Sequence, residues 1–323
     1  MVDMIKQEMM QAIIFNGIGS ADVIETSLRP IPSVGAGEVL IKIAAAGMNR
    51  ADILQRLGKH PPAKGVTDIP GLEVAGSIVG EGTRICALLS GGGYAGYVAV
   101  HRALCFEIPS GMDMVMAAGL PEALFTVTKN VFVLGSLKKD EHLLIHGGAS
   151  GIGTLAIQMA KSIEARVSIT AGSEARCALC MGLGADRAIN YKTHDFVDIL
   201  KNDPVDVVLD MVGGDTLTRD IQIMNFAGRH VSIAYLSGAK AQIDIATIMK
   251  NKLTITGSML RHDVLSDKIK LADIIRASFW PLVVSGQIKP VIDRVFPLDE
   301  ARAAHDYFEL GQHAGKIILN VDN

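Results

Sequence analysis

The chain has 323 residues and a nearly even charge balance, with 31 Lys and Arg against 34 Asp and Glu and a formal net charge of −3 at pH 7. This length predicts about two domains, and the lack of a lysine- or arginine-rich block argues against a nucleic-acid-binding surface. The mean hydropathy is high, at +0.31, but charged residues interrupt every apolar run before it reaches the roughly 18 residues expected of a membrane-spanning helix. We therefore expect a cytoplasmic protein whose apolar strands are buried on both faces of a parallel sheet.

The first third of the chain favours an antiparallel, β-rich domain. Residues 1–9 contain acids and no apolar core, so they are not a secretory signal; they form either a short extension or part of the folded domain. Gly80 to Gly82 predicts a tight hairpin turn. Short runs broken by Gly and Pro predict strands at 11–15, 39–45, 73–79, 84–89 and 94–100.

The pattern becomes helical at 112–134, and from residue 141 strands and helices alternate. Such alternation predicts a doubly wound parallel sheet. A helix at 268–285 follows, and a strand-helix-strand segment closes the chain. The strands of this part are predicted at 143–145, 166–171, 187–191, 205–210, 228–233, 253–256, 290–296 and 316–321.

A glycine-rich turn lies between the strand at 143–145 and the helix that follows. Residues 151–156 read Gly-Ile-Gly-Thr-Leu-Ala, which fits the dinucleotide fingerprint, and the next strand completes a βαβ unit of about 30 residues. The glycines permit a tight turn, and the N-terminus of the helix faces a pyrophosphate. A turn that binds nothing is the alternative. The flanking strand and helix favour a cofactor site formed by Gly148, Ala149, Ser150, Gly151, Ile152 and Gly153.

The residues after the second strand of this unit bear on the choice between NADPH and NADH. An NAD enzyme usually places an Asp or Glu about 20 residues after the first glycine, whereas this chain has Ala171 and Gly172 there. The hydroxyl of Ser173 and the guanidinium of Arg176 suit a 2′-phosphate. Glu174 is the opposing signal, unless it is a solvated acid in the first turn of a helix. We predict NADPH.

The four cysteines predict neither a disulfide framework nor a zinc site. Cys177 and Cys180 form a C-x-x-C in a predicted helix at 174–182, but a second pair at metal-ligand spacing is missing. We expect small, buried, reduced thiols, as in a reducing cytosol.

Six short segments of the sequence, in this order along the chain, resemble the zinc-independent, zeta-crystallin-type quinone oxidoreductases of the medium-chain dehydrogenase/reductase superfamily. The resemblance implies an α/β protein with a GroES-like, β-rich catalytic domain at residues 1–121 and 289–323. It also implies a Rossmann domain, a doubly wound parallel sheet that binds the nucleotide, at residues 122–288. The expected activity is NADPH-dependent reduction of quinones or related electrophilic alkenes. The segments that carry the resemblance are EVLIKI at 38–43, GMNRAD at 47–52, GLEVAG at 71–76, LIHGGASGIG at 144–153, TAGS at 170–173 and GKIIL at 315–319.

The resemblance also implies roles for individual residues. Asn49 and Thr126 are expected at the nicotinamide end as candidate catalytic residues; Asn49 either binds a substrate carbonyl or the ribose, or is a helix cap. A tyrosine matching Tyr191 helps to hold the 2′-phosphate. Lys316 either approaches the cofactor or is a surface charge at the beginning of a strand. The backbone walls of the cofactor site are expected at 230–235, Met259 and Leu260.

This chain differs from the zinc alcohol dehydrogenases of this superfamily at two zinc-ligand positions. Those enzymes need a cysteine after the early strand and a Gly-His-Glu, where this chain has Asn49 and Gly71-Leu72-Glu73. Asparagine and leucine cannot replace thiolate and imidazole ligands. No histidine pairs at ligand spacing with a carboxylate cluster, so we predict no metal. No buried acid is evident, which leaves the proton donor open.

His60 departs from the family pattern, which has a tyrosine beside the substrate at this position. His60 is either a catalytic residue that donates a proton near neutral pH, or an exposed loop histidine. The segment at 76–87 is shorter than in the resembled family, which predicts a shortened surface hairpin.

The sequence thus predicts a zinc-independent NADPH:quinone oxidoreductase. Two alternatives stay open: a reductase of enones, alkenals or 2-enoyl thioesters, and an NADPH-binding protein without significant turnover. The apolar edge strand at 253–256 would be covered by pairing across a two-fold axis, so we predict a homodimer. We predict no nucleic-acid or membrane partner.

Overall fold

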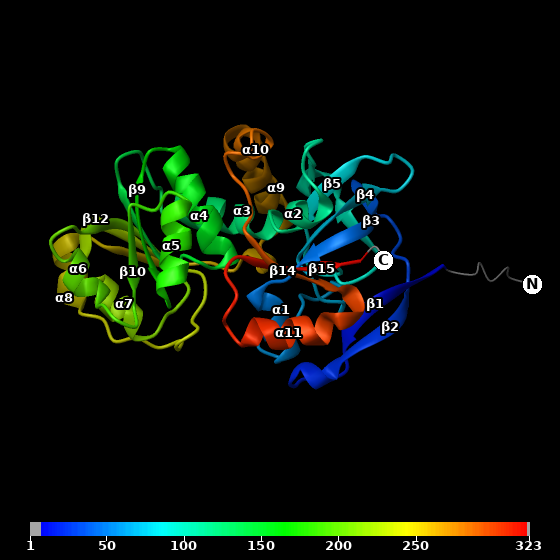
Figure 1. Ribbon diagram of the computed structural model, residues 1–323, viewed down its shortest axis with the longest axis horizontal. Helices are drawn as coiled ribbons and strands as arrows, with labels where there is room; N and C mark the ends of the chain where they lie inside the picture. The colour runs from blue at the N-terminus through cyan, green and yellow to red at the C-terminus, as the bar shows by residue number, and fades with distance from the viewer. Residues whose placement is uncertain (1–7, 322–323) are drawn as a thin grey trace, which may run out of the picture. The chain divides into compact units, whose positions relative to one another are not determined.

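The computed structural model describes residues 8–321. The chain falls into two compact units, Met1–Glu122 with Pro290–Asn323, and Ala123–Lys289 (Figure 1). Of the segment at 1–9, residues 1–7 lie outside the described residues, and Met9 begins the first strand. Among the described residues, no helix combines the length and the apolar character that crossing a membrane requires.

The first unit is β-rich, as the sequence predicts. Its larger sheet has the order β14-β15-β3-β4-β5-β7, with β6 also paired to β3, and β1 and β2 form a separate antiparallel pair. The predicted hairpin turn is confirmed: it joins β4 to β5, and Gly80 and Gly82 have φ angles of +83° and +73°, which favour glycine. The strands are β1 (Met9–Phe15), β2 (Ile24–Pro30), β3 (Glu38–Gly47), β4 (Glu73–Ile78), β5 (Arg84–Leu88), β6 (Tyr97–His101), β7 (Cys105–Glu107), β14 (Ile292–Pro297) and β15 (Lys316–Asn320).

Short helices connect these strands. The α-helices are α1 (Arg50–Arg56), α2 (Met114–Ala118) and α11 (Ala301–Glu309), and the 3₁₀ turns are η1 (Ala21–Val23), η2 (Arg102–Leu104) and η6 (Leu298–Glu300). The sequence pattern misses β2 and β7. The polar sequence IETSLRP of β2 carries no clear apolar alternation, and β7 has only three residues.

The second unit is a six-stranded parallel sheet with helices, and the predicted doubly wound fold is confirmed. The strand order is β10-β9-β8-β11-β12-β13, and α4 and α5 pack against β8, β9 and β10 (Figure 1). The strands are β8 (His142–His146), β9 (Arg166–Ala171), β10 (Arg187–Asn190), β11 (Val205–Asp210), β12 (Met224–Ser232) and β13 (Thr254–Gly257). The helices are α3 (Pro121–Val127), which begins at the unit boundary, the π-helical η3 (Thr128–Leu134), α4 (Gly151–Ser162), α5 (Glu174–Gly182), α6 (Phe196–Leu200), α7 (Asp215–Asp220) and α8 (Ile245–Asn251), followed by the 3₁₀ turn η4 (Leu260–His262).

The predicted helix at 268–285 consists of three consecutive segments. These are α9 (Leu265–Ile274), the π-helical η5 (Ile275–Phe279) and α10 (Trp280–Val284). Pro281 lies in the first turn of α10 and has no N–H to donate. A π-helical turn just before it widens the helix where the regular hydrogen-bond ladder cannot continue.

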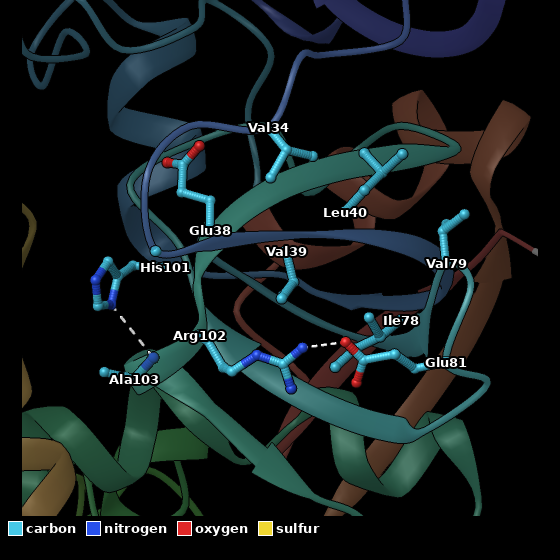
Figure 2. Close-up of a pocket in the computed structure, with 11 residues that line it drawn as sticks. Val34, Glu38, Val39, Leu40, Ile78, Val79, Glu81, His101, Arg102 and Ala103 are labelled. Carbon is cyan, nitrogen blue, oxygen red and sulfur yellow. Dashed lines mark hydrogen bonds and ion pairs between the residues drawn. The ribbon is translucent and has the colours of Figure 1, made fainter.

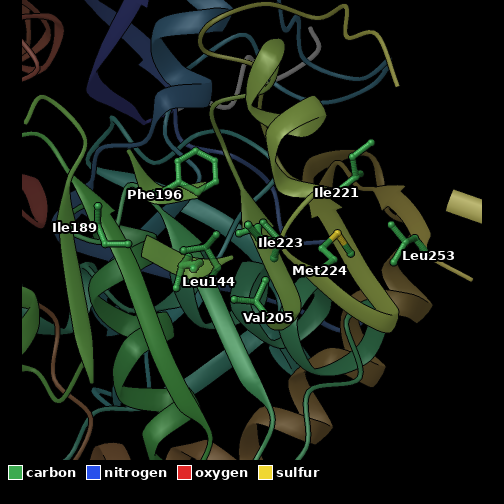
Figure 3. Packing of buried hydrophobic residues seen from close by; sticks show 10 residues of the cluster. Leu144, Ile189, Phe196, Val205, Ile221, Ile223, Met224 and Leu253 are labelled. Atoms are coloured by element: carbon green, nitrogen blue, oxygen red, sulfur yellow. The ribbon is translucent and has the colours of Figure 1, made fainter. Parts of the chain in front are cut away.

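Buried side chains from the strands and from α6 form a core in this unit (Figure 3). Leu144 of β8, Ile189 of β10 and Val205 of β11 belong to it, together with Phe196 of α6. These strands are buried because helices cover the sheet, which explains the continuous apolar runs of the sequence. Through Leu144 this core packs against β8, the strand that the predicted nucleotide turn follows.

Candidate functional site

The turn between β8 and α4 has the geometry of an anion-binding helix N-terminus. Ser150 caps α4, and its Oγ accepts a hydrogen bond from the backbone N–H of Gly153 at 3.0 Å. The N–H of Gly148 donates to the carbonyl of Thr170 in β9, also at 3.0 Å. The first N–H groups of a helix have no partners within it, so those of Gly151 and Ile152 are suited to a phosphate.

Two glycines let this turn pack closely. A Cβ at residue 153 would lie 2.5 Å from the carbonyl oxygen of Gly147, and a Cβ at residue 148 would lie 2.5 Å from the Cβ of Ile169. No side chain fits at either place without moving the backbone or the sheet. The residues present therefore fit a dinucleotide, whose pyrophosphate needs close backbone approach at this turn.

The carboxyl end of β9 brings Gly172, Ser173 and Tyr191 together. A Cβ at residue 172 would lie 2.6 Å from the phenol oxygen of Tyr191, whose side chain is half-exposed. Ser173 caps α5, and its Oγ accepts from the backbone N–H of Arg176 at 3.3 Å. Glu174 is exposed in the first turn of α5, and its carboxylate accepts from the amide of Asn190 at 2.6 Å.

The predicted cysteine interpretation is confirmed for the C-x-x-C of α5. Cys177 and Cys180 are buried and free. Burial raises the pKa of both thiols, that of Cys180 to about 12. They are neutral at physiological pH and are packing residues.

A polar link in the second unit joins two predicted parts of the nicotinamide site. The carbonyl of Thr126 in α3 accepts from the side-chain amide of Asn130 at 2.8 Å. The amide oxygen of Asn130 accepts from the hydroxyl of Ser258 at 2.7 Å. Ser258 precedes Met259, which is half-exposed, and Leu260, which is buried. Asn130 escaped the sequence reasoning, although a lone amide in an apolar helical run signals a buried polar partner.

The first unit contains a buried cluster around Glu73, which we call the Glu73 cluster (Asn49, Glu73 and Lys316). The amide nitrogen of Asn49 donates to Glu73 Oε1 at 2.9 Å. Lys316 Nζ donates to Asn49 Oδ1 at 2.8 Å and to the carbonyl of Met48 at 3.1 Å, and it forms an ion pair with Glu73 Oε1. All three side chains are buried. The interpretation of Lys316 as a surface charge is therefore wrong.

Asp52 is a second buried acid next to this cluster. Its carboxylate accepts from the backbone N–H of Asn49, from that of Gly71 and from the hydroxyl of Tyr94, at 2.8, 3.1 and 3.0 Å. Burial raises the pKa of Tyr94 well above its usual range, and the neighbouring Asp52 carboxylate adds to this effect. Asn49 is the N-cap of α1 in a capping-box arrangement with Asp52, so its helix-cap interpretation is confirmed. The expectation that the chain has no buried acid is wrong: Asp52 in the first turn of α1 and Glu73 at the beginning of β4 are both buried, and each has partners that are distant in the sequence.

His60 lies just after α1 and is half-buried. Its backbone N–H donates to the carbonyl of Leu54 at 3.1 Å, which holds the turn to the end of α1. His60 is thus a partly exposed loop histidine, and a catalytic role stays a prediction.

A buried chain of histidines and aspartates crosses the second unit. Asp220 accepts from the ring of His146 at 2.8 Å and from that of His230 at 3.0 Å, and Asp210 lies 3.6 Å from His230. Burial alone would lower the pKa of His146, but the Asp220 carboxylate raises it above its usual value. The expectation that no histidine pairs with a carboxylate cluster is wrong, because these residues are adjacent only in the folded sheet. Three of them (Asp210, Asp220 and His230) are of metal-ligand type and lie close together, but both Asp220 oxygens already accept hydrogen bonds.

The β-rich unit also carries an open depression with a volume of about 840 Å³ (Figure 2). Figure 2 shows Val39, Leu40 and Val79 among its lining residues, together with the ion pair of Arg102 with Glu81. It contains none of the predicted site residues.

Comparison with known proteins gives the family. The chain matches the family models described as "Alcohol dehydrogenase GroES-like domain" at residues 35–110 and "Zinc-binding dehydrogenase" at residues 183–319. It is 28% identical to the quinone oxidoreductase of Rattus norvegicus, over 97% of this chain and 98% of that one. It is 30% identical to the 2-methylene-furan-3-one reductase of Solanum lycopersicum, over 96% of this chain and 79% of that one.

A solved structure of a quinone oxidoreductase has the same fold as this chain. The quinone oxidoreductase from Thermus thermophilus, whose crystal structures include a complex with NADPH, superposes with a TM-score of 0.86 at 28% identity, covering 97% of this chain and 100% of that one. This chain belongs to the quinone oxidoreductase family of the medium-chain dehydrogenase/reductase superfamily. It is an oxidoreductase acting on a small molecule, and the dehydrogenase family models indicate a nicotinamide cofactor. The GroES-like and Rossmann-like fold expected from the resemblance is confirmed.

Proposed function

We propose that this oxidoreductase transfers a hydride from NADPH to a quinone without a zinc ion. The observation that carries the choice of NADPH is that Ser173 and Tyr191 lie beside Gly172 at the carboxyl end of β9, with Arg176 in the first turn of α5. A guanidinium and two hydroxyls suit a 2′-phosphate. Glu174, an acid in the first turn of α5, is hydrogen-bonded to Asn190.

The remaining parts of the proposed cofactor site are the glycine turn after β8 and the residues expected around the nicotinamide. The turn from Gly148 to Gly153 and the N-terminus of α4 would hold the pyrophosphate. Thr126, Met259 and Leu260 would line the nicotinamide, with Asn130 fixing the carbonyl of Thr126. The bound nicotinamide supplies the hydride from its C4 atom. The protein's part is to position the acceptor and to donate hydrogen bonds to its oxygen.

The proposed independence from zinc is supported by the Glu73 cluster. Asn49 and Leu72 provide neither a thiolate nor an imidazole, and the Glu73 carboxylate already has the Lys316 ammonium as its cation. A quinone is electrophilic enough to accept a hydride without a Lewis acid when it is well positioned. The proton that follows would come from solvent or from His60.

Reduction of an activated alkene is the second candidate. It is favoured by the relative at 30% identity, which is named a 2-methylene-furan-3-one reductase. The same hydride would go to the β-carbon of an enone, and the same donors would face the carbonyl oxygen. The cofactor site therefore does not distinguish the two candidates.

The experiment is to follow the loss of NADPH absorbance without added metal, against an ortho-quinone, a para-quinone, an alkenal and an enoyl thioester. We expect turnover of the quinones, unchanged by a chelator. Turnover of the alkenal alone would move the assignment to the second candidate, and tight NADPH binding with no turnover of any acceptor would indicate a non-catalytic protein.

The variant Arg176→Ala tests the choice of cofactor. It should raise the KM for NADPH by about tenfold or more and leave that for NADH nearly unchanged, because it removes a charge-assisted contact to the 2′-phosphate. Arg187→Ala is the matched control, since Arg187 begins β10 and pairs with Asp203 at 2.8 Å. An equal effect of Arg176→Ala on both cofactors would overturn the assignment.

A further inference from the structure

Lys316 is a lysine with every donor occupied inside the protein. Its side chain is 3% exposed. An ammonium has three N–H donors, and three oxygens receive them: the carbonyl of Met48, Oδ1 of Asn49 and Oε1 of Glu73. No donor is left over for a cofactor phosphate or ribose. A role different from direct cofactor contact is needed to explain a buried cation here.

The Glu73 cluster and the Met48 carbonyl that joins it come from different parts of the first unit. Met48 follows β3, Asn49 caps α1, Glu73 begins β4 and Lys316 begins β15. Asn49 and Glu73 stand where the zinc enzymes of the superfamily have their cysteine and the acid of Gly-His-Glu. The ammonium of Lys316 contacts both of these side chains. It therefore places one positive charge beside Asn49 and Glu73, where the zinc enzymes have a divalent ion.

The hydrogen bonds of the cluster fix the Asn49 amide in one orientation. Its oxygen accepts from Lys316, and its nitrogen donates to Glu73 at 2.9 Å. The second N–H of this nitrogen donates to the carbonyl of Gly47 at 3.4 Å, which is longer than a usual N–H···O hydrogen bond. It is the weakest hydrogen bond of the Asn49 amide, and a substrate oxygen at a shorter distance would replace it. Donation by an ammonium to the amide oxygen polarises the amide and strengthens its N–H as a donor.

We propose that Lys316 is a built-in cation that acts through Asn49: it orients and polarises the Asn49 amide so that its second N–H binds the carbonyl oxygen of the quinone. Lys316 is thus a positioning residue for the substrate and not a ligand of the cofactor. This inference rests on the proposed function, because it assigns the substrate oxygen to that site. The charge developing on this oxygen as the hydride arrives is stabilised by a donor that is already in place.

A double-mutant cycle on the full-length enzyme tests the proposal. The variants are Lys316→Met, Asn49→Ala and their combination, with Lys42→Met as the matched control, since Lys42 is an exposed lysine of β3 in the same unit. Lys316→Met should lower kcat for the quinone by about ten- to a hundredfold, as expected for the loss of a charge-assisted hydrogen bond. The dissociation constant of NADPH, measured by fluorescence titration, should change by less than about threefold, and in the Asn49→Ala background Lys316→Met should have little further effect on kcat.

Two results would overturn the inference. An equal loss of kcat in the presence and absence of the Asn49 amide would show that Lys316 acts independently of it. A weakening of NADPH binding as large as the loss in kcat would make Lys316 a cofactor ligand. If Lys316→Met does not fold because Glu73 is left as a buried charge, Lys316→Met/Glu73→Gln removes both charges and carries the same expectation.

Chemical rescue separates this inference from the proposed function. In Lys316→Ala, propylammonium should enter the space left by the side chain, restore kcat and raise the unfolding temperature, whereas tetramethylammonium, which has no N–H, should do neither. A wild-type enzyme that reduces no quinone would overturn the proposed function, and the rise in unfolding temperature would still report the ammonium site. Absence of both rescue effects in an enzyme that does reduce quinones would overturn the inference alone.

Discussion

The phenol oxygen of Tyr191 lies against the backbone of Gly172, where a Cβ atom would come within 2.6 Å of it. The two residues directly follow the neighbouring parallel strands β9 and β10, and the N–H of Tyr191 donates to the carbonyl of Ala171 at 3.0 Å. The hydroxyl is thus held over the segment where β9 passes into α5. This contact is the part of the proposed 2′-phosphate site that can be disturbed without touching a charge.

Gly172→Ala is expected to weaken NADPH binding selectively. The added methyl must push the Tyr191 ring aside, which costs little stability because the side chain is 55% exposed. The KM for NADPH should rise by about three- to tenfold, the equivalent of one hydrogen bond, while that for NADH should hardly change. Gly182→Ala, at the end of α5 with no atom within 4 Å of the added Cβ, is the control. A large fall in unfolding temperature, or an equal rise in both KM values, would contradict this.

The nucleotide half of the site could be predicted because it is local in the sequence. The turn from Gly148 to Gly153 lies in one continuous segment, and its chemistry depends on backbone groups of that segment. The strands buried on both faces could likewise be read from apolar runs, and β9, α5 and β11 have the predicted bounds. What the pattern missed, β2 and β7, lacks such runs because these strands are polar or very short.

The buried polar contacts could not be predicted, because the sequence does not show which distant residues meet. Lys316 and Asn49 are 267 residues apart, and His146 and Asp220 are 74 apart. Each of these side chains looks like an exposed charge or a loop residue until the sheet brings its partner beside it. Charged groups are buried only when paired, so the pairing itself is the information that folding adds.

Asp220→Asn is expected to destabilise the second unit strongly. Asp220 is fully buried and accepts from the rings of His146 and His230. Burial would raise the pKa of Asp220, but His146 and its hydrogen bond bring it below its usual value, so the carboxylate is charged. Asparagine keeps only one acceptor oxygen, so one of the two buried rings loses its acceptor and meets an N–H donor instead, and the free energy of unfolding should fall by about 3–5 kcal/mol.

The measurement is urea unfolding at pH 6, where the raised pKa of His146 keeps its ring charged. Asp198→Asn is the control: Asp198 is exposed on α6 and pairs with Lys201, and its loss should change stability by no more than about 0.5 kcal/mol. If Asp220→Asn and Asp198→Asn had the same free energy of unfolding, the buried Asp220–His146 contact would not be an ion pair.

His305 makes the first unit sensitive to acid. Its ring is fully buried in α11, with its edges against Phe15 and Tyr94, and the Arg56 guanidinium lies 3.5 Å from its Nδ1. Burial, and then the charge of Arg56, lower its pKa to about 3 from an ordinary value of 6.5. Between these values the unfolded chain binds a proton that the folded protein does not. The contribution of His305 is therefore fully present above pH 6.5 and is lost as the pH falls toward 3, by about 4–5 kcal/mol in total.

His305→Gln should move the midpoint of acid unfolding to lower pH, because glutamine has no proton to take up. Circular dichroism along an acid titration measures it, and His194→Gln, at an exposed position, should leave the midpoint where it is. An unchanged midpoint in His305→Gln would mean that other groups dominate acid unfolding.

The edge strand β13 leads us to propose a homodimer. Among the described residues, β13 pairs with β12 on one side, and its other edge has no strand partner. Phe226 of β12 and Ile245 and Met249 of α8, which packs on β12, are 64, 67 and 74% exposed. An open edge beside apolar side chains is a liability that a second copy would cover by pairing across a two-fold axis.

Light scattering at micromolar concentration should give twice the 34.3 kDa of one chain. Thr254→Lys, which places a charge on the exposed edge, should give the single-chain mass, while Leu28→Lys on the exposed face of β2 should remain dimeric. A wild-type protein that scatters as a single chain would contradict the proposal, and so would a Thr254→Lys variant that stays dimeric.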